Sequence, residues 1–355
     1  MDVMRNRIRP ILDSLRQWRC RFSEELTEVE IRPGDYHFSE KLDADQLKDG
    51  WMSFGACETW GGRDRHFWFR TKVVIRKEWA GKEVRVTLNT GADDIWNTDN
   101  PQIMAYKNGI LSGTMDMNHQ DLILAEEAEE AEVFELVFYA YSNSENPTNF
   151  FHLKAAVYDR EIADLYYDLK VPFEAAELCS EEDLDRIEAM KFLNTAISGL
   201  DLRKPGSEEF YQSVREVREY VKKNLPDICR SSRVTVHSIG HTHIDVAWKW
   251  PLRQTRQKAV RSFQTVLNLM EQYPEYKFMS SQPQLYEFVK EEAPELFEKI
   301  KEKIHEGRWE AEGGMWLEPD CNLASGESLI RHILYGKRFF EKELGAQKTG
   351  SALAA

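Results

Sequence analysis

The sequence predicts a multidomain protein: an antiparallel β-sandwich, a helical connector, and then β-α units around a parallel sheet. Three observations carry this prediction. Short alternating strands with turn signals fill residues 35–160. Helical periodicity dominates residues 161–231. Strand and helix patterns alternate over residues 232–346, which requires parallel pairing. We expect an N-terminal helix in residues 1–34 and an atypical tail at 347–355.

Composition limits the class of protein. The 355-residue chain is 42% apolar and 30% charged, as is ordinary for a globular protein. Its net charge of -14 argues against nucleic-acid and anionic-membrane partners. No apolar run approaches the roughly 18 residues that span a bilayer. The cysteines are odd in number and lack CxxC spacing, which favours reduced thiols in a cytoplasmic protein: Cys20, Cys57, Cys179, Cys229 and Cys321.

The first elements follow from periodicity. Residues 1 to about 30 are expected to form an amphipathic helix, because apolar side chains recur at helical spacing from Ile8 to Trp18. Alternating apolar residues then predict strands at 67–75, 84–88, 133–141 and 150–158. Asn108-Gly109, between two apolar runs, predicts a hairpin with a type I′ turn.

The connector is predicted to be helical. Ser180 is expected to cap a helix whose apolar face includes Leu193 and Ile197. A second helix is expected to begin at Ser207 and to end near Pro226.

Three β-α units follow. Strands are expected at 234–240, 277–281 and 308–313, and helices at 257–272, 285–305 and 325–344. Ser325 is a plausible cap for the last helix. An open sheet and a partial barrel both fit this pattern.

The residues that carry chemistry lie after the first of these strands, in His241-Thr-His243-Ile-Asp245-Val-Ala-Trp248. Side chains two residues apart on a strand point the same way, so His243 and Asp245 can converge on one ion. Imidazole and carboxylate suit Zn²⁺, and another divalent metal is possible. His241 could be a third ligand, and we favour a role as a hydrogen-bonding neighbour of the ligands. The competing interpretation is that these are ordinary surface or core histidines.

The turns after the other two strands add candidates. Gly313-Gly-Met-Trp316-Leu-Glu318-Pro-Asp320 offers an indole and two carboxylates, and Ser280-Ser281-Gln282 offers small hydrogen-bonding groups. Trp248 and Trp316 fit a sugar site, because an indole stacks on the apolar face of a pyranose. Core packing is the alternative for the tryptophans. Loop solvation is the alternative for Glu318 and Asp320.

The chain resembles the glycoside hydrolase family 38 α-mannosidases in these motifs. His241-Thr-His243-Ile-Asp245-Val-Ala-Trp248 resembles the family's opening motif. The runs from Gly307 to Asp320 and from Ser325 to Ser328 are similar to the bacterial and cytosolic-type branch. The similarity covers about residues 230–346, and the preceding β-rich region resembles that branch's N-terminal sandwich more weakly.

The resemblance implies a zinc-dependent retaining exo-α-mannosidase with a seven-stranded β/α barrel. It implies that His243 and Asp245 bind zinc, and that Trp248 stacks on the terminal mannose. We also expect Trp316 and Asp320 to contact the substrate. Mannose has cis hydroxyls at C2 and C3, which can chelate a metal. The expected substrate is a mannose-containing oligosaccharide with terminal non-reducing α-D-mannose, in mannose or oligosaccharide catabolism.

The family's nucleophile is an Asp in a D-x-F-G-type motif expected just after Gly345, and no such motif occurs here. The acid/base Asp and a distal His ligand are likewise expected beyond residue 355, so the chain looks truncated and its own activity is left open. Three alternatives stay open. The chain could be a non-catalytic carbohydrate-binding fragment, a metal-dependent polysaccharide deacetylase, or a fragment that aggregates through unpaired strand edges.

Overall fold

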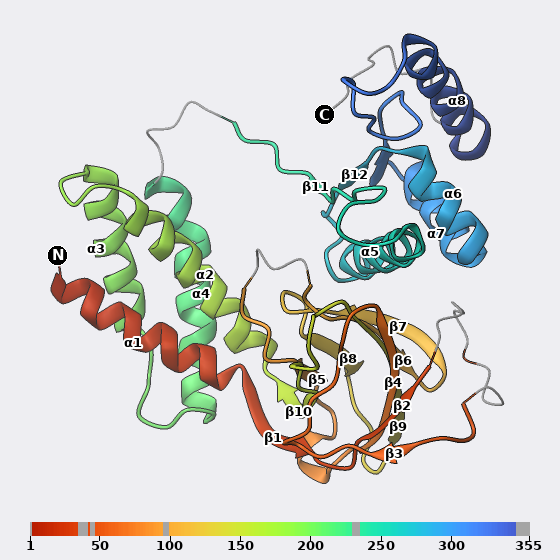
Figure 1. The fold of residues 1–355 in the computed structure, drawn as a ribbon. Helices are drawn as coiled ribbons and strands as arrows, with labels where there is room; N and C mark the ends of the chain where they lie inside the picture. The colour runs from red at the N-terminus through yellow and green to blue at the C-terminus, as the bar shows by residue number, and fades with distance from the viewer. Residues whose placement is uncertain (1, 35–41, 43–46, 95–98, 229–234, 346–355) are drawn as a thin grey trace.

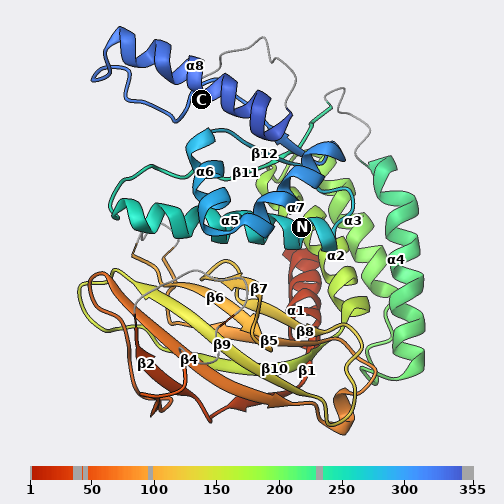
Figure 2. The same cartoon turned by 90° about the vertical axis from the view of Figure 1, so that its right-hand side faces the viewer.

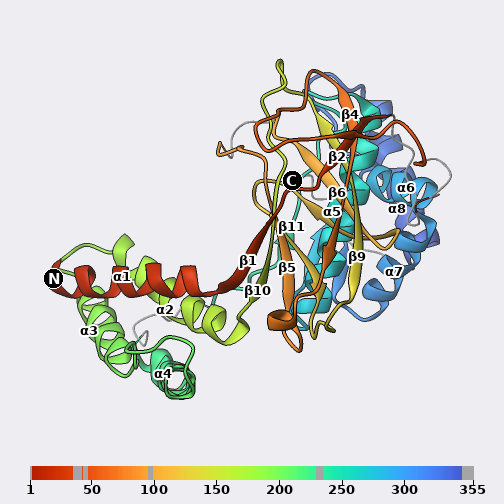
Figure 3. The same ribbon diagram turned by 90° about the horizontal axis from the view of Figure 1, so that it is seen from below.

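The computed structural model describes residues 2–34, 42, 47–94, 99–228 and 235–345, which form three parts (Figure 1). A two-sheet β structure occupies one end of the molecule. A group of helices extends to one side of it, and a smaller α/β unit lies against it elsewhere (Figure 3). The sequence thus predicted the mixed architecture with antiparallel sheets correctly.

The first part is a sandwich of two antiparallel sheets. The 4-stranded sheet has the order β1-β10-β5-β8, and the 6-stranded sheet the order β3-β2-β4-β9-β6-β7. The strand bounds are β1 (Cys20–Leu26), β2 (Glu30–Pro33), β3 (Met52–Ser53), β4 (Arg65–Val74), β5 (Val84–Asn89), β6 (Gln102–Lys107), β7 (Ile110–Met115), β8 (Asp121–Ala125), β9 (Val133–Ser142) and β10 (His152–Tyr158), and a short 3-10 helix, η1 (Lys77–Trp79), joins β4 to β5.

Alternation explains the sandwich core. Val84, Val86 and Leu88 of β5 are buried and face side chains of β4 and β9 such as Phe69 and Phe138. Every second side chain of such a strand points inward, so alternating sequences bury one face only. The hairpin expected at Asn108-Gly109 is present between β6 and β7, and both residues have the positive φ of a type I′ turn, 51° and 79°.

The helical part differs from the sequence prediction in two places. Helix α1 (Asp2–Trp18) ends earlier than residue 30, and strand β1 begins at Cys20. Helix α3 (Leu184–Ser198) is capped by Asp183, whose side chain accepts a hydrogen bond from Asp185 N, and not by Ser180. The other helices are α2 (Arg160–Leu178) and α4 (Glu208–Ile228), and α4 continues through Pro226. Ile8, Leu12 and Leu15 of α1 are buried against these helices, as their spacing predicted.

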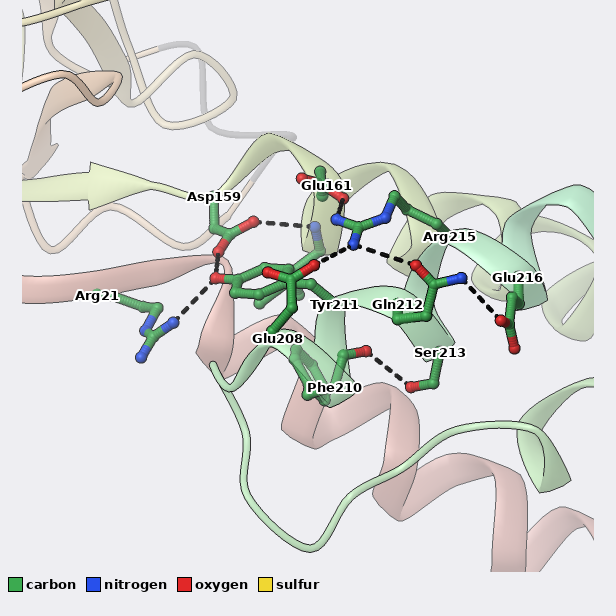
Figure 4. Close-up of polar contacts among 11 residues, drawn as sticks. Arg21, Asp159, Glu161, Glu208, Phe210, Tyr211, Gln212, Ser213, Arg215 and Glu216 are labelled. Carbon is green, nitrogen blue, oxygen red and sulfur yellow. Dashed lines mark hydrogen bonds and ion pairs between the residues drawn. The ribbon is translucent and has the colours of Figure 1, made fainter.

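A polar junction ties the helices to the sandwich (Figure 4). Asp159 caps α2 by accepting a hydrogen bond from Ile162 N at 3.1 Å, and the Tyr211 hydroxyl of α4 donates to the same carboxylate. Arg21 of β1 donates to that hydroxyl at 3.0 Å. One carboxylate thereby connects the end of β10, the start of α2 and α4.

The third part is the α/β unit. Its strands β11 (Gly240–His241), β12 (Phe278–Ser280) and β13 (Trp309–Ala311) pair in parallel in the order β11-β12-β13. The helices are α5 (Leu252–Gln272), α6 (Pro283–Glu292), α7 (Pro294–His305) and α8 (Gly326–Leu344). Trp309 lies at the centre of its core, 1% exposed, with Phe263 and Phe278 edge-on to its ring.

Several predicted bounds in this unit were wrong. Residues 235–239 are not a strand, and β11 has only two residues, so His241 lies within the strand. Helix α5 begins at Leu252 and not at 257. The single helix expected over 285–305 is two helices, because Pro294 cannot donate a backbone hydrogen bond and opens a new helix after Ala293. Ser325 does cap α8, accepting from Ser328 N at 3.2 Å.

The sandwich and the α/β unit share a core along α5 (Figure 2). Tyr106 and Tyr139 of the 6-stranded sheet belong to the same apolar cluster as Phe263 of α5. Asn268 of α5 donates to the carbonyl of Ser112 in β7 at 3.1 Å. The α/β unit is therefore seated on the β6–β7 hairpin, and the sandwich supports the site described next.

The domain division and the seven-stranded barrel remain predictions. Cys229, the boundary at 231/232 and the tail at 347–355 lie outside the described residues. Among the helices that the structure describes, none is both long and apolar enough to cross a bilayer.

Candidate metal and carbohydrate site

The loop after β11 carries His243 and Asp245 on one side because the residue between them is buried. Ile244 is 4% exposed and belongs to the core under α5. Neighbouring side chains in extended backbone point in opposite directions, so burial of Ile244 turns both polar neighbours outward. Nε2 of His243 lies 3.3 Å from Oδ1 of Asp245.

That distance allows a test of the metal expectation. Zinc binds histidine nitrogen and carboxylate oxygen at about 2.0–2.2 Å, so two donors of a tetrahedral site lie about 3.4 Å apart. The observed 3.3 Å fits this spacing. Both side chains are also open to solvent, 54% and 42% exposed, so an ion could reach them. The described residues contain no cluster of three or more His, Cys, Asp or Glu side chains that could hold a metal ion.

Glu318 contacts the other side of the His243 ring. Its Oε2 lies 3.2 Å from Nδ1 of His243, and its Oε1 accepts a hydrogen bond from Ser281 Oγ at 3.2 Å. A carboxylate on the ring nitrogen that faces away from a metal fixes which nitrogen carries the proton, and it orients the ring. The sequence offered Glu318 only as a loop carboxylate, because its pairing with His243 depends on two separate strands.

Further contacts hold the two loops. Thr255 of α5 donates to the carbonyl of Asp245 at 3.3 Å and accepts from the Trp250 indole at 3.0 Å. The loop after β13 is fixed by α8, because Trp316 N donates to the His332 carbonyl at 2.9 Å. The site is therefore built from loops that helices brace on both sides.

The other predicted site residues lie in different settings. Trp248 is 58% exposed and stands edge-on to Trp250, so much of its surface is open to a ligand. Trp316 is partly buried: its indole N–H donates to Gln284 Oε1 at 2.9 Å, and its ring packs edge-on against Phe339.

Asp320 is exposed, and its Oδ1 accepts from Asn322 N at 2.8 Å in a tight turn. His241 is bonded through Nδ1 to the Met279 carbonyl at 3.0 Å, which ties it to the neighbouring strand and not to His243. Binding roles for these residues remain predictions.

Comparison with known proteins gives the family. Residues 233–353 match the model of the glycosyl hydrolases family 38 N-terminal domain. The chain is a family 38 α-mannosidase-like protein. It is 31% identical over 343 residues to alpha-mannosidase G of Dictyostelium discoideum, a match that covers 92% of this chain.

Two further relatives agree with this assignment. The α-mannosidase of Saccharomyces cerevisiae is 30% identical, and alpha-mannosidase 2C1 of Mus musculus is 29% identical, each over 78% of this chain. The α-mannosidase-like chain spans 30% of the length of the Dictyostelium relative and 27% of the other two. The resemblance inferred from the HxHxD motif is thereby confirmed.

Proposed function

We propose that this protein is an α-mannosidase that removes terminal non-reducing α-D-mannose from oligosaccharides by a zinc-assisted retaining mechanism. The observation that carries the proposal is the 3.3 Å approach of His243 Nε2 and Asp245 Oδ1 at the carboxyl end of a parallel strand. Ligand sites of α/β proteins form at this end of the strands. The relatives are named α-mannosidases, which supports the substrate class.

In this proposal His243 and Asp245 hold the metal. Bound there, zinc supplies a Lewis-acidic centre for sugar hydroxyl oxygens. The Glu318 carboxylate, whose Oε2 lies 3.2 Å from Nδ1 of His243, favours the tautomer with the proton on Nδ1, which leaves the Nε2 lone pair directed at the site. The exposed indole of Trp248 offers an apolar surface on which a pyranose ring can stack. We place the reaction in mannose or oligosaccharide catabolism in the cytoplasm.

The test measures zinc affinity and hydrolysis of p-nitrophenyl α-mannoside in one preparation. His243→Ala should weaken zinc binding at least about 10-fold, because a direct ligand is lost. His305→Ala, an exposed histidine at the end of α7, serves as the matched control and should leave zinc binding unchanged. Equal zinc affinity in the two variants, or hydrolysis that does not depend on zinc, would contradict the proposal.

A further inference from the structure

Gln282 has an unusual place in the α/β unit. It lies two residues after the end of β12, immediately precedes α6, and has a left-handed backbone with φ 64° and ψ 82°. Residues with a Cβ adopt this conformation at a steric free-energy cost that is absent for glycine. Gln282 is nevertheless a long polar side chain, only 4% exposed. We therefore expect the Gln282 side chain to make contacts that a glycine could not make.

The Gln282 amide connects the two loops of the candidate site. Its Nε2 donates to the carbonyl of Ile244 at 3.2 Å, between His243 and Asp245. Its Oε1 accepts from the backbone N–H of Glu318 at 3.4 Å. A carboxamide carries both a donor and an acceptor, so it can satisfy a carbonyl on one loop and an N–H on the other. Without the Gln282 amide, the two loops would lose both of these hydrogen bonds.

We propose that Gln282 is a positioning residue that sets the contact between Glu318 and His243. The amide fixes the spacing between the loop after β11 and the loop after β13, and neighbouring Ser281 orients the Glu318 carboxylate. Because Glu318 reaches Nδ1, this spacing controls how the imidazole presents Nε2 beside Asp245. This inference rests on the proposed function, in which His243 is a zinc ligand.

The test uses the full 355-residue chain. Gln282→Gly deletes both amide hydrogen bonds while it relieves the backbone, so the variant should keep its fold. Gln282→Asn is the second variant, since Asn tolerates a left-handed backbone but is one methylene shorter. Gln264→Ala is the matched control: Gln264 is similarly buried on α5, and its amide donates to Asn268 within the same helix.

Two measurements decide the inference. The zinc dissociation constant of Gln282→Gly should rise by about 10-fold or more. Mutation of residues that hold a metal ligand in place typically weakens metal binding by at least this factor. Nitrogen-15 NMR of the metal-free chain in alkaline buffer should show a His243 tautomer ratio set by both neighbouring carboxylates, Asp245 at Nε2 and Glu318 at Nδ1. In Gln282→Gly the ratio should shift toward the form with the proton on Nε2, because the Glu318 contact is loosened while Asp245 remains beside Nε2. Gln264→Ala should resemble the unaltered chain in both measurements.

The two failures can be told apart. If zinc affinity and the His243 tautomer are the same in Gln282→Gly, Gln282→Asn and the unaltered chain, Gln282 does not position the ring. If His243→Ala leaves zinc affinity unchanged, the proposed function fails instead. The NMR measurement still decides the positioning role in that case, because it requires no metal.

Discussion

Nδ1 of His243 lies 3.2 Å from Oε2 of Glu318, so residues of the loops after β11 and β13 meet across β12. The sheet order β11-β12-β13 makes this contact possible, because both outer strands deliver their loops to the same edge. The imidazole is thus held between two carboxylates, Asp245 at Nε2 and Glu318 at Nδ1.

The first prediction concerns the contact between Glu318 and His243. Glu318→Gln keeps the shape of the side chain but removes its charge, so the Nδ1–H of His243 loses a charged acceptor. We expect zinc affinity to fall about 10-fold, measured by competition with a chelating dye. Glu298→Gln is the control, because Glu298 is exposed and pairs only with Lys301 on its own helix among the contacts described. Equal affinity in the two variants would rule out a role for Glu318 in orienting the ring.

The second prediction concerns Gly336 in α8. A Cβ added there would lie 2.4 Å from the carbonyl oxygen of Gly314 and 2.9 Å from Trp316 N. Alanine normally stabilises a helix interior by up to about 1 kcal/mol relative to glycine. Here it must push α8 away from the loop that carries Glu318, so Gly336→Ala should lower the free energy of unfolding by about 1–3 kcal/mol. Urea denaturation measures this change.

The control for Gly336 is Gly326→Ala at the first residue of the same helix. Nothing lies within 4 Å of a Cβ at Gly326. We expect that variant to be as stable as the unaltered chain or slightly more stable. Similar losses at both positions would show that α8 does not pack closely on the loop.

The third prediction concerns a buried hydroxyl beneath the sheet. Tyr286 is 0% exposed, its OH accepts from Trp309 Nε1 at 2.9 Å, and it donates to the Ser280 carbonyl at 2.9 Å. Burial raises the pKa of this phenol, which keeps it protonated and able to donate. Tyr286→Phe leaves the buried Trp309 N–H without its acceptor, whereas the Ser280 carbonyl still accepts from Glu312 N, so the free energy of unfolding should fall by about 1–3 kcal/mol. Tyr335→Phe, at an exposed position, should change it by less than about 0.5 kcal/mol.

The fourth prediction concerns pH. Burial opposes ionisation of Asp116, but the hydrogen bond and charge of His119, with Arg261 nearby, hold the pKa of this carboxyl well below its usual range. The hydrogen bond from Asp116 raises the pKa of His119, against burial and Arg261. The carboxylate's contribution to stability is present above about pH 4 and is lost as pH falls further. The histidine's contribution is present below about pH 6.5 and is lost as pH rises through its raised pKa.

Asp116→Asn should therefore destabilise the protein most between about pH 4 and 6.5, and less at alkaline pH. The His119 side chain is 49% exposed, so solvent screening keeps the pH-dependent part below about 1 kcal/mol. Thermal denaturation at a series of pH values measures this pH-dependent destabilisation. Asp93→Asn, at an exposed position, is the control. A difference between the two variants that is independent of pH would contradict the coupling.

Local pattern determined much of the fold. The apolar alternation of β5, the Asn108-Gly109 turn and the Ser325 cap each depend on residues close together in the chain, so periodicity and turn chemistry were sufficient. The predicted bounds failed where the signal was weak or was overridden. Two-residue β11 has no periodicity of its own, and Asp183 caps α3 in place of Ser180 because both residue types favour that position.

The sequence by itself indicated the family through its motifs, and it predicted that His243 and Asp245 point to one side because they are two residues apart. Only the tertiary structure decided which groups face that pair. The contacts of Glu318 and Gln282 join three strand ends, and they depend on strand order, on a left-handed backbone and on main-chain hydrogen bonds. None of these leaves a periodic trace in the sequence, because side-chain periodicity records burial within one element and not which elements become neighbours.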